Sequence, residues 1–507
     1  MGVRTFLGSC ALAVMAATVV SPSLAQQRQD NLRVAFSRDT DFVARIQTDS
    51  IESGTLSAAV YDTLLYDAPT GGFAGLLATA WRWVDERTID LDLRQGVTFH
   101  DGEPFDADDV VFTVAFAADP RNNLRQQAQD FGFLDRAEKL GPHKVRLHLK
   151  QPFPLAEHIL ASRLTILPDA FTTKEGPAAH ASRPVGTGPY RVAEMRAGQS
   201  YVLRANPGYF DGPKPKAQIG TVTIRTIADT QTQVAEMMGG GLDMIFNVPD
   251  DLAKNLATMP NLQVAYGDTA RFNFLSLDVA GRNGDTPLKD QRIRQAIAHA
   301  IDREAIVKNL VGGTSTATVS PCHPRQLFCT QDVATYRHDP ARARQLLAEA
   351  GVPPGTRLSL INGDATLRPV GEAIQGYLRT VGITVEFETF TLPAWRTQLL
   401  QGKSTMSIVG WGSGGVFDTG RALPTFFNGA EGDYARDQEV VDWVTRAGAT
   451  TDKAVREDLY RRALIRIAER AYVVPLFTSS VPFVVSRDVE FKPDRDTPEF
   501  VRARWRR

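Results

Sequence analysis

The stretch LRQGVTFHDGEPFDADDVV, residues 93–111, joins two kinds of secondary structure. From Thr88 to Phe99 apolar and polar side chains alternate, with the period of two expected of a half-buried strand. The HDG that follows is typical of a turn, and Asp106 or Asp108 is the expected N-cap of a helix that Pro120 ends. The stretch therefore predicts a strand, a turn and a helix in one compact unit.

Outward from this unit, the chain shows a second alternating segment and then a boundary. Val145–Leu149 has the same alternation and predicts another strand. The turn formers PVGTGPY at 184–190 lie between apolar runs and indicate the passage from one unit to another. A helix is predicted from Thr230 to Met238, with Gly239 in the left-handed conformation common after a helix.

Beyond Arg271, strands and helices alternate. A helix begins at the cap Asp339-Pro340 and ends at Gly351, and strand 358–361 follows it. A further helix and the strand around 385–388 complete the pattern. Because strand–helix–strand order favours parallel pairing, we expect a second α/β lobe here.

The composition suggests several folded units. At about 100–200 residues per domain, 507 residues suggest about three of them. Hydrophobic residues are 43% and charged residues 23%, as in globular proteins. Lys and Arg number 57 against 58 Asp and Glu, so no basic field is present to hold nucleic acid, and we expect no such partner.

Residues 1–25 have the pattern of a cleaved signal peptide. Arg4 is the only charge before an apolar run from Phe6 to Val20, and small residues precede the predicted cleavage after Ala25. The run has about 15 residues, whereas about 20 are needed to span a bilayer. The LGSC ending at Cys10 resembles a lipoprotein box, but most of the apolar segment follows the cysteine, so we expect no lipid anchor.

Removal of this leader leaves two cysteines, Cys322 and Cys329, in an oxidising compartment. We therefore predict a disulfide between them. The alternative is a metal site with His323 and His338, but the spacing matches no common zinc pattern. We expect no bound metal.

The sequence contains no common catalytic signature. GWGSGG at 410–415 fits the dinucleotide pattern G-x-G-x-x-G, but FDTG at 417–420 reads as loop where that site needs a helix. A glycine loop that lets a ligand approach the backbone is the preferred interpretation. No P-loop, HExxH or GxSxG string occurs, so we expect a protein that is not an enzyme and has no cofactor. An exported hydrolase of peptides or sugars, with scattered catalytic residues, is the alternative.

Several segments, taken in order, resemble the family 5 solute-binding proteins of ABC transporters, which receive dipeptides, oligopeptides, nickel chelates and related solutes outside the cytoplasm. They are residues 60–65, 93–105, 107–110, 186–190, 206–210, 293–306, 339–351, 410–411 and 474–476. The resemblance implies a monomeric periplasmic receptor that delivers a small molecule or peptide to an ABC permease in the inner membrane.

The resemblance also implies an α/β fold of two lobes, the periplasmic binding protein fold of type II and cluster C, with an extra small domain. The first lobe would comprise residues 30–55, 182–268 and 479–507, the extra domain 56–181, and the second lobe 269–478. Strands near 268 and 478 would link the lobes. A ligand that contacts both lobes would then favour their closure.

In such a fold, ligand-binding residues are expected at the cleft. They are Arg38, Asp39 and Thr40 of the first lobe, and Arg271, Phe272, Asn273, Trp411, Gly412, Ser413 and Gly414 of the second.

One position departs from the family's pattern. Gly414 stands where peptide-binding members commonly have an aspartate for the ligand's amino terminus. Asp418 is a candidate replacement, and Arg421 or Arg396 is available for a ligand carboxylate. Trp395 is expected either to stack on the ligand or to pack in a helix. A peptide is the preferred ligand, and opines, sugars, metal chelates and other small polar solutes are the alternatives.

Overall fold

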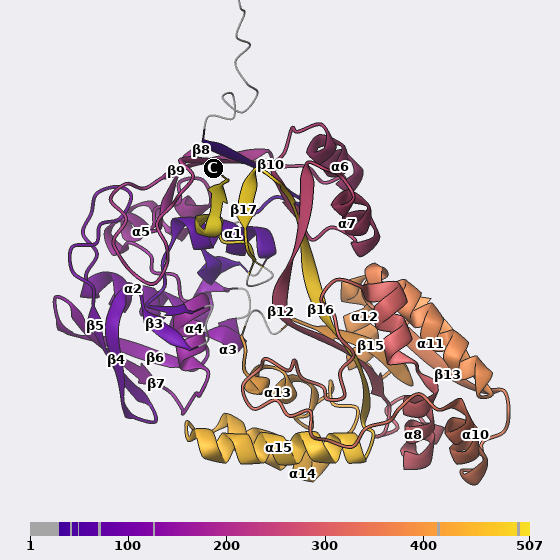
Figure 1. Cartoon of the computed structure of the whole chain (residues 1–507). Coiled ribbons are helices and arrows are strands. Elements are labelled where there is room, and N and C mark those ends of the chain that lie inside the picture. The colour runs from indigo at the N-terminus through magenta and orange to yellow at the C-terminus, as the bar shows by residue number, and fades with distance from the viewer. Residues whose placement is uncertain are drawn as a thin grey trace, which may run out of the picture.

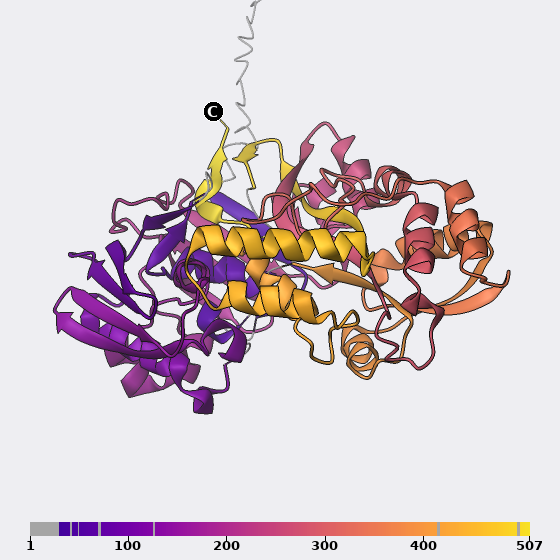
Figure 2. The ribbon, with the colours of Figure 1, turned by 90° about the horizontal axis from the view of Figure 1, so that it is seen from below.

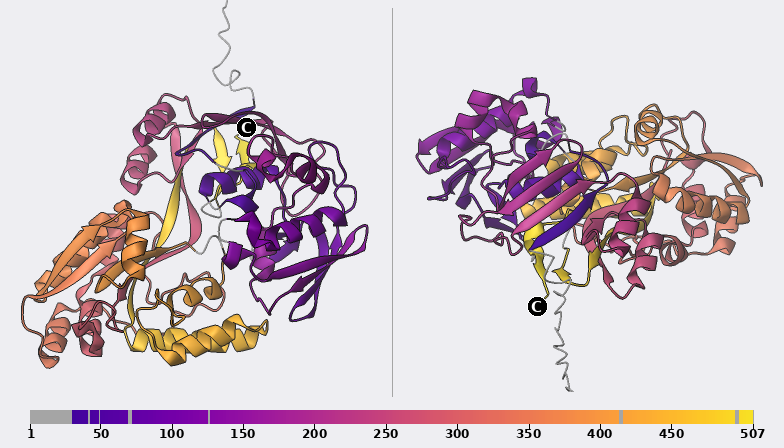
Figure 3. Two further views of the ribbon diagram at one scale, coloured as in Figure 1. Left: turned by 180° about the vertical axis from the view of Figure 1, so that it is seen from behind. Right: turned by 90° about the horizontal axis from the view of Figure 1, so that it is seen from above.

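The structure, a computed structural model, describes residues 30–506 apart from 41–42, 49, 69–71, 125–126, 413–415 and 494–496. The predicted signal peptide and the predicted site residues Ser413 and Gly414 lie outside the described residues. Figure 1 shows two lobes joined by a pair of long strands, and Figure 3 shows the same junction from behind. No helix in the described part of the chain is long and apolar enough to cross a membrane.

A ten-stranded sheet runs through both lobes. Its strands in spatial order are β14 (Ile383–Thr389), β13 (Thr356–Asn362), β15 (Met406–Trp411), β12 (Leu262–Leu277), β16 (Val473–Ser486), β11 (Met244–Phe246), β1 (Asn31–Phe36), β10 (Thr221–Thr226), β9 (Ser200–Ala205) and β8 (Tyr190–Arg196). The strands β12 and β16 pair with each other and pass from one lobe to the other. Their register shifts between Asp268 and Phe272. The lobe boundaries predicted near 268 and 478 fall within these two strands.

The small domain of the first lobe contains residues 93–111, the predicted strand, turn and helix. Its sheet has the order β4 (Ala78–Asp85), β5 (Thr88–Leu93), β7 (Lys144–Leu149) and β6 (Leu134–Gly141), and α2 (Ala107–Ala118) packs against β6. The short elements around it are β2 (Leu65–Asp67), β3 (Phe73–Gly75), α3 (Gln127–Asp130), α4 (Ala156–Ser162) and α5 (Asp169–Glu175).

The local predictions for this stretch are confirmed except at one strand end. Asp106 is the N-cap, because its carboxylate accepts from Asp108 N, and Asp109 completes a capping box. The strand predicted to reach Phe99 ends at Leu93 instead. The reason is Gly96, whose φ of 72° turns the chain out of the sheet.

The rest of the first lobe packs helices around β1 and its neighbours. The helix α1 (Ile51–Val60) is almost entirely buried in a core shared with the small domain. The helices α6 (Thr230–Met238) and α7 (Asp250–Ala257) cover a separate small core. The hairpin of β17 (Val489–Phe491) and β18 (Ala503–Trp505) lies beside α1. The left-handed glycine after α6 is Gly240 with φ 69°, so its prediction at Gly239 is wrong by one residue.

The second lobe has the predicted strand–helix–strand order. The helix α11 (Arg368–Thr380) connects β13 to β14, and these two strands are parallel, as predicted. They share a core with α8 (Gln291–Ala300), α9 (Arg303–Ile306) and α10 (Pro340–Glu349). The segment 293–306 is two helices, because Asp302 caps a new one at Arg303. Asp339 caps α10 as predicted.

A further helical layer completes the second lobe. It consists of α12 (Leu392–Leu400), α13 (Leu423–Phe426), α14 (Gln438–Gly448) and α15 (Lys453–Glu469). Together with Phe272 and Phe274 of β12, these helices form a core of their own. Figure 2 shows α14 and α15 side by side, with α15 extending from the second lobe across to the first.

A buried histidine makes the first lobe sensitive to acid. The Tyr61 hydroxyl donates to Nδ1 of His180 at 2.8 Å, and Nε2 lies 2.9 Å from the Thr172 hydroxyl, whose own hydrogen is donated to Pro168 O. The imidazole is therefore neutral, with its proton on Nε2. Burial lowers the pKa of His180 to about 4.

The stability of the protein should fall as the pH drops from about 6.5 to about 4. In this range the imidazole of His180 is protonated in the unfolded chain but stays neutral in the folded protein. Between pH 7 and pH 5 this amounts to about 2 kcal/mol. In urea unfolding at the two pH values, His180→Gln should therefore lose about 2 kcal/mol less than the parent on acidification. An equal loss of stability in the parent and in His180→Gln would contradict the assignment of this pH dependence to His180.

Candidate functional site

A cavity of about 450 Å³ lies between the two lobes. The first lobe contributes Asp67, Ala68, Gly72, Phe73, Trp81, Pro154, Glu157 and His158, and the second contributes Arg325, Leu327, Phe328, Phe417, Asp418, Lys453 and Arg456. Cavities of roughly 300–1,000 Å³ are typical of sites for small molecules. The size and the two-sided lining make this cavity the candidate binding site.

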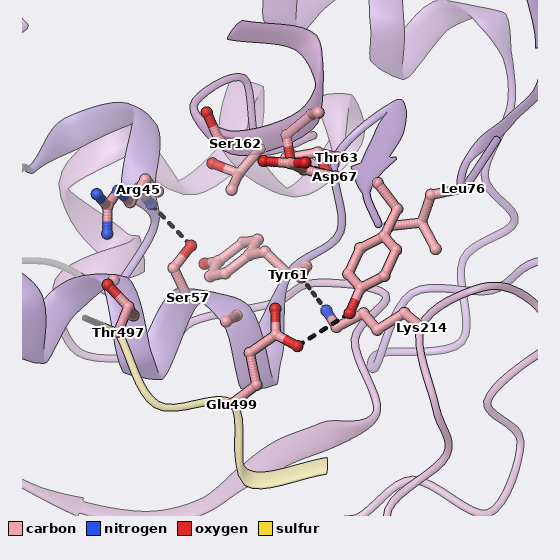
Figure 4. A pocket seen from close by; sticks show the side chains of 15 residues that line it. Arg45, Ser57, Tyr61, Thr63, Asp67, Leu76, Ser162, Lys214, Thr497 and Glu499 are labelled. Carbon is pink, nitrogen blue, oxygen red and sulfur yellow. Dashed lines mark hydrogen bonds between the residues drawn. The ribbon is translucent and has the colours of Figure 1, made fainter. Parts of the chain in front are cut away.

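A second cavity, of about 100 Å³, lies inside the first lobe and is shown in Figure 4. Several of its polar side chains are bonded to one another or to nearby backbone. Lys214 Nζ donates to Tyr61 O at 3.1 Å, and the Tyr66 hydroxyl donates to Glu499 at 3.0 Å. The small volume and these internal bonds favour a structural role for the second cavity.

The wall that the first lobe gives to the interlobe cavity is largely aromatic. Phe73 and His158 meet edge to face, with ring centroids 4.8 Å apart. The Trp81 indole donates to Glu157 Oε1 at 2.6 Å, which occupies part of that carboxylate. Burial lowers the pKa of His158, so its imidazole is neutral at pH 7. This wall therefore presents aromatic side chains, a neutral imidazole and a carboxylate that already accepts a hydrogen bond from the protein.

The opposite wall is built on a disulfide-closed loop, residues 322–329. Cys322 and Cys329 are bonded as predicted, with their Cα atoms 5.8 Å apart. Within the loop, Leu327 pairs with the segment that follows β15: its N–H donates to Phe417 O at 2.9 Å, and its carbonyl accepts from Thr419 N at 3.1 Å. The Arg325 guanidinium lies over the Phe417 ring at 5.1 Å.

The candidate replacement for the missing aspartate, Asp418, already has a partner. It is 1% exposed, and its two carboxylate oxygens accept from Arg456 Nη1 at 3.0 Å and Nη2 at 2.8 Å. Gly420 N donates to the same group at 2.7 Å. Although Asp418 lines the cavity, its charge is balanced by Arg456, a residue that the sequence analysis missed.

The predicted partner of a ligand carboxylate, Arg421, is engaged across the cleft. Its Nη2 donates to Asp130 Oδ1 of α3 at 2.6 Å, and both side chains are 5% exposed. Arg163 of the first lobe lies on the other side of the same carboxylate, with Nε 3.7 Å from Oδ2. Arg421 therefore joins the two lobes. Arg396, the other candidate, is exposed on α12.

The predicted residues of β12 and β15 lie side by side near the crossing strands. Phe272 pairs with Trp411, and its side chain is fully buried in the core of the second lobe. Asn273 Nδ2 donates to Ser479 Oγ at 2.7 Å. Arg271 lies against Gly412, where an added Cβ would approach its side chain to 3.5 Å.

The two predicted tryptophans have different surroundings. Trp411 ends β15 half-buried, edge to face with Phe426 at 5.2 Å, and among the described residues its indole N–H has no hydrogen-bond partner. Trp395 is 9% exposed, donates to Ser407 Oγ at 2.8 Å and packs against Gly363. The packing alternative accounts for Trp395.

The predicted residues of the first lobe follow β1. Asp39 and Thr40 both bond the Tyr201 hydroxyl, at 2.8 and 2.7 Å. Arg38 donates to Glu52 at 2.9 Å, and its side chain is 63% exposed. Within the described part of the chain, Asp418 is the one predicted residue that also lines the interlobe cavity.

The other residues that line this cavity were not predicted from the sequence. Most have no local signal, because they meet only after the two lobes have formed. One signal was available in CHPRQLFC, residues 322–329, where a predicted eight-residue disulfide loop carries Leu327 and Phe328. A short loop has little room to bury two large apolar side chains. An adjacent pair of them in such a loop therefore indicates an exposed apolar surface that takes part in binding.

A family model described as bacterial extracellular solute-binding proteins, family 5 Middle, matches residues 72–434. The glutathione-binding protein GsiB of Escherichia coli (strain K12) is 26% identical over 422 residues, which are 80% of each sequence. The crystal structure of the ABC transporter substrate-binding protein CtaP from Listeria monocytogenes has a TM-score of 0.83 at 21% identity, covering 94% of this chain and 99% of that one. The periplasmic binding protein DppA from Helicobacter pylori, in complex with the peptide STSA, has a TM-score of 0.76 at 22% identity, covering 96% and 100%. The two structural matches show the two-lobed fold.

Proposed function

The chain belongs to the bacterial extracellular solute-binding proteins of family 5, and we propose that the cavity between its lobes holds the solute. The matched region covers more than half of the chain. The protein is accordingly a solute receptor of an ABC importer. The observation that carries the proposed site is the lining of one cavity by side chains of both lobes.

This arrangement couples binding to closure. A solute in the cavity gains all its contacts only when the lobes are together, so its binding free energy shifts the population toward the closed form. The ion pair between Asp130 and Arg421 joins the same two lobes, so opening of the lobes would break it. A permease that recognises the closed surface would then receive loaded receptors in preference to empty ones.

The proposed solute is a peptide or a similar small polar molecule. GsiB is named for glutathione, and the Helicobacter pylori protein was crystallised with a peptide. The cavity volume of about 450 Å³ suits a molecule of that size. Because Asp418 is paired with Arg456, we do not assign it to the solute's amino group.

We further propose that residues 1–25 are a signal peptide cleaved after Ala25 and that the mature chain works in the periplasm as a monomer. Its partners would be the solute and the inner-membrane permease, with no nucleic acid. The near balance of acidic and basic residues supports the last point. We propose that no bond is made or broken in the solute.

The direct test is mass spectrometry of the gently purified protein under native conditions. We expect one solute molecule per chain, released unchanged on denaturation. X-ray scattering should show a smaller radius of gyration with the solute than without it. Conversion of the solute on incubation would instead support the hydrolase alternative, and identical scattering curves would contradict closure.

Trp411→Ala should lower the affinity for the retained solute several-fold and leave the fold intact. Trp411 is not among the residues that line the interlobe cavity, but its half-buried indole ends β15 with an N–H that no described residue satisfies, so we propose that the bound solute extends beyond the cavity and accepts from it. Trp395→Phe is the matched control, because it removes the Ser407 bond in the core. The control should cost about 1 kcal/mol of stability and no affinity. Calorimetric titration and thermal unfolding separate the two results.

A further inference from the structure

The disulfide loop at residues 322–329 places an apolar side chain where solvent reaches it. Leu327 is 52% exposed, although it lies in a segment whose backbone is fixed on both sides by the bonds to Phe417 and Thr419. The following residue, Phe328, has a φ of 65°, which is unfavourable for a residue with a side chain. The next residue, Cys329, is tied back to Cys322. The loop thus holds Leu327 in one orientation at the wall of the interlobe cavity.

The surroundings of Leu327 in the cavity are also apolar. Phe328 and Phe417 line the same wall, and Phe73 and Trp81 line the wall opposite, in the small domain. The aromatic pair on the far side therefore belongs to a different lobe from the leucine. An apolar group placed between them would be removed from water from both sides, and only when the lobes are closed.

The lining of the cavity also carries charged groups on both walls. Glu157 accepts from the Trp81 indole, Asp418 is paired with Arg456, and the Arg325 guanidinium lies over the Phe417 ring. Arg325 and Lys453 lie with Leu327 on the second-lobe side, and Asp67 lies on the first-lobe side. A solute with both polar ends and an apolar side chain matches this lining better than a wholly polar one.

We propose that the disulfide-closed loop forms an apolar subsite of the interlobe cavity, which selects peptides carrying a branched aliphatic or aromatic side chain. This inference rests on the proposed function, and it narrows the solute class. The disulfide serves the subsite by holding Leu327 against the cavity.

The test uses the full mature chain and a panel of tripeptides that differ at one position, with alanine, serine, lysine, glutamate, leucine or phenylalanine placed at each position in turn. At the position that meets the subsite, leucine or phenylalanine should bind at least about tenfold more tightly than alanine, because a large apolar side chain is buried. Leu327→Ser should abolish this preference, so that the leucine and alanine peptides bind this variant with affinities within about twofold of each other.

Leu392→Ser is the matched control, since Leu392 is 56% exposed at the start of α12 and is not part of the cavity lining. The control should keep the full preference. Reduction of the disulfide, checked by mass, should weaken the preference, and an unchanged preference after reduction would overturn the role of the disulfide.

The outcomes distinguish a failure of the proposed subsite from a failure of the proposed receptor function. If peptides bind but apolar residues are not favoured at any position, the subsite is refuted and the receptor stands. If Leu327→Ser keeps the preference of the parent, the subsite lies elsewhere and the assignment is refuted. If no peptide binds while another retained solute does, the peptide class is refuted. If nothing binds and nothing is retained, the proposed function fails as well.

Discussion

Asp130→Asn is expected to lower the affinity for the solute about 100-fold, since the closed form would lose about 3 kcal/mol of stability relative to the open one. Asp130 accepts from Arg421 of the opposite lobe at 2.6 Å, and both groups are almost fully removed from water. The neutral amide would leave the Arg421 guanidinium buried without a counter-charge. Opening of the lobes would expose the same guanidinium to water, so its share of the penalty falls on closure, whereas Arg163 of the first lobe, 3.7 Å from the same carboxylate, loses counter-charge in both forms.

Calorimetric titration with the retained solute measures this loss directly. Asp135→Asn is the control, because Asp135 pairs with Arg136 at 2.9 Å on the surface, where both side chains are about half exposed. Exposed pairs contribute roughly 0–1 kcal/mol, so this variant should bind as the parent does. X-ray scattering of the Asp130→Asn protein without solute should show a more open average. An affinity within twofold of the parent would remove the ion pair from the closing mechanism.

The sequence predicted the local elements well because their causes are local. The Asp106 and Asp339 caps accept from backbone N–H groups within three residues. The sequence pattern that predicts each cap is therefore contained in a few neighbouring residues. The disulfide needed only two cysteines and an exported chain. The errors, such as the strand end at Leu93, come from single glycines whose conformation depends on the neighbouring structure.

The candidate site was predicted less well, since its contacts are distant in sequence. Asp130 and Arg421 are 291 residues apart, and Asp418 and Arg456 are 38 apart. The residues that neighbour Asp130 and Asp418 in the sequence do not indicate their partners. The motifs that carried the family resemblance therefore predicted the architecture of the chain, and the partners of Asp418 and Arg421 emerged from the folded structure.

Residues from three of the motifs that carried the family resemblance meet at the buried carboxylate of Asp62 in the first lobe. Asp62, from the motif at 60–65, accepts from Thr187 at 2.9 Å, from the Tyr209 hydroxyl at 3.1 Å and from Lys214 Nζ at 2.8 Å. Thr187 and Tyr209 come from the motifs at 186–190 and 206–210. Burial and the Asp62 charge raise the pKa of Tyr209, so its hydroxyl stays protonated. This cluster joins the start of the small domain to the rest of the lobe.

Lys214→Met should therefore lower the free energy of unfolding by about 3–5 kcal/mol, because it leaves a fully buried carboxylate with two neutral donors and no cation. The Lys214 and Asp62 side chains are 4% and 0% exposed. Lys216→Met is the control two residues away, since Lys216 pairs with Asp211 at 2.9 Å with side chains that are 51% and 94% exposed. Its loss should stay below about 1 kcal/mol.

Urea unfolding followed by circular dichroism compares the two lysine variants, and the first-lobe transition should move to lower urea in Lys214→Met alone. A similar shift in both variants would mean that the lysines act through net charge or through their apolar stems. The double variant Asp62→Asn with Lys214→Met distinguishes these causes further. If the uncompensated carboxylate is what destabilises the lobe, neutralising it should recover part of the lost stability, since an amide is far less costly to bury than a charge.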